Sequence, residues 1–134
     1  MCGITGFIST NNLTQNETKT VINNMASTLS HRGPDDTGCW NNESDQVALG
    51  HKRLAILDLT TSGHQPMISS SNRFVIVFNG EIYNHLKLRK EIDKYNISKN
   101  INLSWKGSSD TETLLVCFEL WGLEDTLNKL VGMF

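Results

Sequence analysis

The fold is decided at the N-terminus, by the stretch Met1-Cys2-Gly3-Ile4-Thr5-Gly6-Phe7-Ile8. If Met1 is removed, Cys2 becomes the first residue and carries both a thiol and a free α-amino group. An α-amino group has a reference pKa of about 7.7–8.0. It can therefore take the proton from a thiol and return it to a leaving group, as a general base must. The glycines leave room for close backbone approach, and the apolar residues of the stretch predict a strand that buries this terminus. The alternative is that Cys2 is an arbitrary residue at a frayed end of the chain.

Length and composition limit the function classes. The chain has 134 residues, of which 38% are hydrophobic, and a net charge of −2. Acidic and basic residues are interspersed, so nothing indicates nucleic acid or an anionic membrane as a partner. No apolar stretch approaches the roughly 20 residues of a membrane span. Cys2, Cys39 and Cys117 are too few and too irregularly spaced for a disulfide framework, and no paired spacing indicates a metal site. We therefore expect a cytoplasmic, reducing compartment that keeps the Cys2 thiol free.

Apolar periodicity predicts three helices. One covers about residues 17–30, a second starts at Asn84 or His85, and a third follows Ser109 and ends near Gly122. The order Ser109-Asp110-Thr111-Glu112 has the form of a capping box. Strands are expected at 46–59, 73–78 and 101–105, with a shorter one from Cys39. The chain closes on the apolar run 130–134, from which we expect a domain that is incomplete at its C-terminus.

Two loops and one arginine carry possible site residues. His31 and Arg32 stand before the turn 33–38 and are positive groups suited either to a solvated loop or to a site. Arg53 stands beside the apolar residues 54–57, where it needs a partner such as a carboxylate unless it lies at a strand edge and points to solvent. His64, in the loop 60–67, is by itself no evidence of catalysis.

The dipeptide Asn79-Gly80 allows two interpretations. Between apolar runs it is the strongest short signal for a hairpin turn. Alternatively, the Asn79 amide and the Gly80 N–H both point at a developing oxyanion. Glu81 beside them is a carboxylate able to hold an ammonium group, and Asp110 is either a recognition carboxylate or a residue that favours the helix dipole.

Taken together and in this order, these pieces closely resemble the glutaminase domain of glutamine-dependent asparagine synthetases, which are class II glutamine amidotransferases. The resemblance covers nearly the whole chain and rests on six stretches: 2–7 (CGITGF), 31–35 (HRGPD), 50–58 (GHKRLAILD), 63–67 (GHQPM), 78–85 (FNGEIYNH) and 109–112 (SDTE). It implies the N-terminal nucleophile hydrolase fold: an α+β domain, residues 1–134, in which two mainly antiparallel sheets pack face to face between helices. The HRGPD form is similar to the asparagine synthetase branch more than to the sugar-phosphate or phosphoribosyl amidotransferases.

The resemblance also implies a role for each site residue. Cys2 attacks the side-chain amide of glutamine, and Asn79 and Gly80 form the oxyanion hole. Arg53 pairs with the α-carboxylate, and the α-ammonium is held by Glu81 and Asp110. The backbone near Ile56 and Leu57 completes the pocket.

The partners implied are glutamine and an ATP-using synthetase domain that amidates aspartate and is absent from this sequence. No cofactor is expected in this domain, since ATP and magnesium belong to the synthetase domain. A homo-oligomer is possible. The alternatives are a non-catalytic module that binds glutamine or packs against a synthetase, as retention of Met1 would produce, and a glutaminase that serves another acceptor.

Overall fold

The computed structural model describes residues 1–56, 58–99 and 103–134 and divides the chain into two compact units. The first contains residues 1–56, 64–67 and 76–79. The second contains the described residues of 57–63, 68–75 and 80–134. Small antiparallel sheets and three helices make this an α+β protein, as expected. The face-to-face packing of two sheets stays a prediction.

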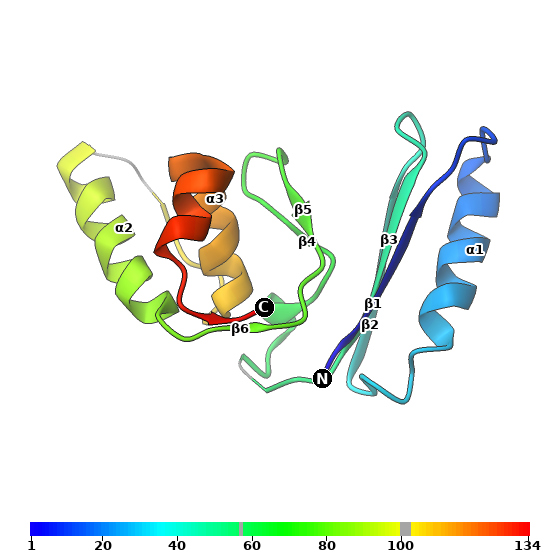
Figure 1. The fold of residues 1–134 in the computed structure, drawn as a ribbon, viewed down its shortest axis with the longest axis horizontal. Coiled ribbons are helices and arrows are strands. Elements are labelled where there is room, and N and C mark those ends of the chain that lie inside the picture. The colour runs from blue at the N-terminus through cyan, green and yellow to red at the C-terminus, as the bar shows by residue number, and fades with distance from the viewer. Residues whose placement is uncertain (57, 100–102) are drawn as a thin grey trace. The chain divides into compact units, whose positions relative to one another are not determined.

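The first unit is built on a three-stranded sheet in the order β1-β3-β2, with β1 Gly3–Ile8, β2 Asp36–Asn42 and β3 Val47–Arg53. Both pairings are antiparallel. Helix α1 (Gln15–Ser27) lies along one face of this sheet (Figure 1). Gly50 makes the close approach possible, because a Cβ there would lie 3.3 Å from Ile22 Cδ1 and 3.4 Å from Ala26 Cβ. Ile22, Ala26 and Ala48 are fully buried and form this layer's core.

Helix α1 starts two residues earlier than the periodicity predicts, because a capping box fixes its first turn. The Thr14 hydroxyl accepts the Glu17 N–H, and the Glu17 carboxylate accepts the Thr14 N–H at 2.9 Å. Each satisfies a backbone donor that the helix start leaves open.

The second unit is built around two helices, α2 (His85–Lys99) and α3 (Asp110–Lys129), which pack side by side (Figure 1). The short strand β6 (Glu81–Ile82) pairs antiparallel with β7 (Gly132–Met133). Its core gathers side chains from β6 and both helices, among them Ile82, Leu88, Ile92, Leu114, Leu115 and Cys117. Cys117 is a core residue, as predicted, and burial raises the pKa of its thiol to about 12.

The third helix was predicted to end near Gly122, whereas α3 is kinked there and continues to Lys129. The φ of 78° and ψ of 178° of Gly122 lie in a region that only glycine adopts easily. The 3₁₀ turn η1 (Thr61–Gly63) and the paired strands β4 (Met67–Ile68) and β5 (Val75–Ile76) complete the elements. Among the described residues, no helix combines the length and apolar character needed to span a membrane.

Several strands are shorter than predicted. The long strand expected at 46–59 ends at Arg53, and only Val75–Ile76 of the run 73–78 is strand. The strand expected at 101–105 is wrong for residues 103–105, which have no regular structure. Its first two residues lie outside the described part of the chain.

Candidate functional site

The Cys2 thiol is held at one end of the first unit's sheet. Residue 2 directly precedes β1, where Gly3 is paired with Lys52 of β3. The Leu54 N–H donates to Cys2 Sγ at 3.3 Å, and the thiol lies 3.6 Å from the Leu54 carbonyl oxygen. The Leu54 backbone therefore offers the sulfur both a donor and an acceptor. The half-buried Cys2 thus has both a fixed position and a polar partner.

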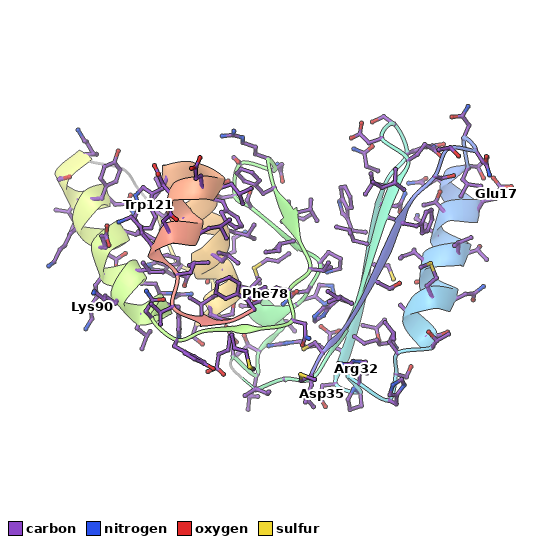
Figure 2. The ribbon with its side chains drawn as sticks, viewed as in Figure 1. Glu17, Arg32, Asp35, Phe78, Lys90 and Trp121 are labelled. Carbon is purple, nitrogen blue, oxygen red and sulfur yellow. The ribbon has the colours of Figure 1, made fainter. Side chains whose placement is uncertain are left out.

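The loop 31–35 supports this end of the sheet. Arg32 Nε donates to the Cys2 carbonyl oxygen at 3.3 Å. The Asp35 N–H donates to the Arg53 carbonyl at 3.0 Å, and the Asp35 carboxylate accepts the Ala55 N–H at 2.8 Å. Figure 2 shows Arg32 and Asp35 at the end of the sheet where the chain begins. The loop is therefore held to Cys2 and to β3 by hydrogen bonds, rather than being only a solvated connection.

Arg53 is buried, with 7% of its surface exposed, so the solvent-pointing alternative is excluded. Across the β2–β3 pairing it lies opposite Asp36, whose carboxylate is 2.6 Å from His64 Nδ1. Burial alone would raise the pKa of Asp36. Hydrogen bonds from His64 and the Thr37 N–H, together with the charges of His64 and Arg53, lower it overall. Asp36 is thus a carboxylate on the neighbouring strand whose pKa responds to the charge of Arg53.

Asn79 follows Phe78, whose N–H donates to Gln65 Oε1 at 2.6 Å. The hairpin interpretation of Asn79-Gly80 is wrong, because β6 pairs with β7, and β5 pairs with β4. Nor is Asn79 among the described non-glycine residues with positive φ, which a type I′ turn requires. Gln65 was quoted only as part of a motif, and its role in fixing the backbone before Asn79 was missed.

The two residues predicted to hold an ammonium group both belong to the second unit, where Asp110 contacts the residue that follows Glu81. Asp110 begins α3 and has 6% of its surface exposed. Its Oδ2 accepts the Ile82 N–H at 2.8 Å and its Oδ1 accepts the Thr111 N–H at 2.9 Å. Glu81 directly precedes Ile82 and is exposed. Each oxygen of Asp110 has a further lone pair, so it can accept from a ligand as well.

The N-terminus of α3 departs from the predicted capping box in one half. The Ser109 hydroxyl accepts the Glu112 N–H at 3.1 Å, as a cap does. The Glu112 carboxylate, however, accepts from Lys106 N–H at 2.7 Å, from Gly107 N–H at 3.1 Å and from Arg89 Nη2 at 3.1 Å. The segment before Asp110 is therefore held by Glu112, which follows it in the sequence, and by Arg89 of α2, which precedes it.

Of the remaining predicted site residues, Ile56 is 71% exposed and Gly80 is also exposed. Leu57 lies outside the described residues. Arg89 was predicted only as a helix position; its polar contacts carry no local sequence signal.

The comparisons with known proteins identify the family of the chain. The family model of the glutamine amidotransferase domain matches residues 1–134, which is the whole chain. The chain belongs to this family. All of it aligns with the asparagine synthetase [glutamine-hydrolyzing] 3 of Bacillus subtilis at 38% identity, and with a putative asparagine synthetase [glutamine-hydrolyzing] 2 of Methanocaldococcus jannaschii at 35%. A relative with a different name, amidase chry2 of Gibberella zeae, is 32% identical over the same extent.

The chain spans only 20% of the length of the Bacillus and Gibberella relatives and 27% of the Methanocaldococcus one. The similarity therefore concerns one part of each relative. The predicted family is confirmed, and the parts of those proteins outside this match have no counterpart in the present sequence.

Proposed function

We propose that this chain hydrolyses glutamine to glutamate and ammonia through a thioester on Cys2. The observation that carries the proposal is the Cys2 thiol itself: it is fixed by Leu54 at the end of β1, one peptide bond from the N-terminus, in a chain of the glutamine amidotransferase family. Met1 is 68% exposed, so it is accessible for removal. Its removal frees the α-amino group that serves as the base.

In the proposed reaction, the Cys2 amine takes the thiol proton and Sγ attacks the side-chain amide carbon of glutamine. The carbonyl oxygen becomes an oxyanion, which the Asn79 amide and the Gly80 N–H stabilise. The amine then gives its proton to the departing nitrogen, and ammonia leaves as the C–N bond breaks. Water attacks the γ-glutamyl thioester, releases glutamate and restores the thiol.

Recognition of the amino-acid head follows from the charges. Arg53 would bind the α-carboxylate in two-point contact, which a planar guanidinium provides and a lysine does not. Glu81 and Asp110 would bind the α-ammonium, and the backbone at Ile56 and Leu57 would complete the contacts. A ligand without this head forgoes these charged contacts and is expected to bind more weakly.

The ammonia would pass to an ATP- and magnesium-dependent synthetase domain that amidates aspartate. This part of the proposal is supported by two relatives that are named glutamine-hydrolysing asparagine synthetases. Because one relative is named an amidase rather than an asparagine synthetase, an acceptor of ammonia other than aspartate is the alternative. A binding module without turnover is the second candidate. It is favoured by one observation: Met1 precedes Cys2, and while it stays the base is blocked as an amide.

The test compares ammonia release and glutamine binding on the same samples. Cys2→Ala is expected to abolish ammonia release and to keep glutamine binding, measured by calorimetry, close to that of the parent protein. Cys39→Ser is the matched control, because Cys39 is a free, exposed cysteine outside the proposed machinery. Full turnover by Cys2→Ala would refute the mechanism, whereas binding without turnover by the parent protein would establish the binding module.

A further inference from the structure

We infer that Arg89 of α2 is a positioning residue for Asp110 and thereby sets the affinity for the α-ammonium of glutamine; this rests on the proposed function. Arg89 reaches from α2 to the start of α3. Its Nη1 donates to the Gly107 carbonyl at 2.8 Å, and its Nη2 donates to the Ser109 carbonyl at 2.8 Å. Both acceptors are backbone groups in the three residues before Asp110. The guanidinium therefore fixes the path of the chain into that residue.

The remaining contacts of Arg89 hold the first turn of α3 itself. Nε donates to Thr113 Oγ1 at 2.7 Å, and Nη2 also contacts Glu112 Oε2 at 3.1 Å. The guanidinium carbon lies 4.1 Å from the centroid of the Trp105 ring. The planar guanidinium of Arg89 stacks on the aromatic ring and directs several N–H donors at these acceptors at once. The ammonium group of a lysine cannot reproduce this arrangement. The side chains of Arg89 and Glu112 are only 12% and 15% exposed, so water screens their interaction weakly.

Asp110 connects this network to the proposed ammonium site. Its carboxylate accepts the Ile82 N–H, and Ile82 is the residue after Glu81. A shift of the segment 107–109 thus moves the Asp110 oxygens with respect to Glu81. Burial chiefly lowers the pKa of the neighbouring His85; the positive charge of Arg89 lowers it further, whereas Asp110 and Glu81 raise it. These charges all act on the same small region of the second unit.

A purely structural role for Arg89 makes a different prediction, because general loosening of the α2–α3 pair would impair all substrates alike. The same helix pair carries a second ion pair, between Lys129 Nζ and Glu91 Oε1 at 2.9 Å, with side chains 39% and 48% exposed. Lys129→Gln removes this pair without touching the segment before Asp110. It is the matched control for Arg89→Lys.

The experiment measures kcat and KM for glutamine, and kcat/KM for glutaramate, which is glutamine without the α-amino group. For Arg89→Lys we expect a rise in the KM for glutamine of about tenfold, with kcat and the turnover of glutaramate changed by less than about twofold. Lys129→Gln is expected to match the parent protein in all three quantities. Adding Arg89→Lys to Asp110→Asn is expected to change the KM little further, because both act on one interaction.

Equal losses for glutamine and glutaramate, or a full additional loss in the double variant, would overturn the inference while leaving the glutaminase proposal intact. If Arg89→Lys does not fold, Thr113→Val decides, since it removes one acceptor from Arg89 at nearly constant volume and is expected to raise the KM for glutamine selectively. If the parent protein binds glutamine without turnover, the same comparison is made with dissociation constants. A parent protein that neither binds nor hydrolyses glutamine refutes the proposed function and this inference with it.

Discussion

The brace formed by the loop 31–35 gives a steric prediction, tested by Gly33→Ala. A Cβ on Gly33 would lie 2.3 Å from the Lys52 carbonyl oxygen, 2.4 Å from the Lys52 carbonyl carbon and 2.6 Å from the Arg53 carbonyl carbon. Non-bonded carbon atoms prefer separations of about 3.5–4.0 Å. All three obstacles are backbone atoms of β3, so no side chain can rotate away to make room. The loop must therefore withdraw by about 1 Å.

This withdrawal stretches two hydrogen bonds, from the Asp35 N–H to Arg53 and from the Ala55 N–H to the Asp35 carboxylate. A neutral hydrogen bond contributes about 0.5–1.5 kcal/mol and one to a charged group about 1.5–3 kcal/mol. Asp35 is exposed to water, which reduces its share. We expect the free energy of unfolding to fall by about 1–3 kcal/mol, in the range typical of overpacked sites. Because Arg32 holds the Cys2 carbonyl from the same loop, kcat/KM is expected to fall by about tenfold or more as well.

Gly122→Ala is the control for this prediction. A Cβ there meets no heavy atom within 4 Å, but its φ of +78° strains any other residue. It is expected to lower the free energy of unfolding by about 1–2 kcal/mol and to leave kcat/KM per folded molecule unchanged. The free energy of unfolding is measured by urea unfolding, and kcat/KM by ammonia release, for both variants and the parent protein. A Gly33→Ala protein with the parent's unfolding midpoint and the parent's kcat/KM would refute the proposed brace.

Three further predictions concern other parts of the chain. Thr14→Ala removes the cap of α1 and is expected to cost about 1 kcal/mol in urea unfolding; an unchanged midpoint would contradict the capping box. Burial alone would raise the pKa of Glu119, but hydrogen bonds from serines 69–71 lower it to about 2. The contribution of Glu119 to the free energy of unfolding is therefore complete above its ordinary pKa of 4.5 and is lost as the pH falls toward about 2. Glu119→Gln should make the unfolding midpoint depend less steeply on pH in this range. An equally steep dependence in the variant would contradict the prediction. Cys117, with its raised pKa, is expected to resist iodoacetamide at about pH 8 until the protein unfolds, and rapid modification of native protein would disprove its burial.

The sequence predicted well those features whose causes are local. The strand after Cys2 and the amphipathic helix carrying Ile22 and Ala26 both follow from the local pattern of residues. The sequence did not show that Asp36 lies opposite Arg53, because that position depends on the β2–β3 register.

The errors arise where a distant segment decides the structure. Asn79-Gly80 has the composition of a hairpin turn, yet Glu81–Ile82 pairs with Gly132–Met133 from the end of the chain. Glu112 stands where a capping box places its acid, but the donors of Lys106, Gly107 and Arg89 compete for its carboxylate. Such contacts between segments far apart in sequence have no local signature.

The central claim is that Cys2 is the nucleophile of a glutaminase, and peptide mapping by mass spectrometry tests it most directly. The protein is treated with a diazoketone analogue of glutamine, which alkylates a nucleophile bound beside it, with and without excess glutamine. The account predicts a mass lacking Met1 and a single adduct on Cys2 that excess glutamine prevents. An intact Met1 with no adduct, or an adduct that glutamine does not suppress, would contradict it.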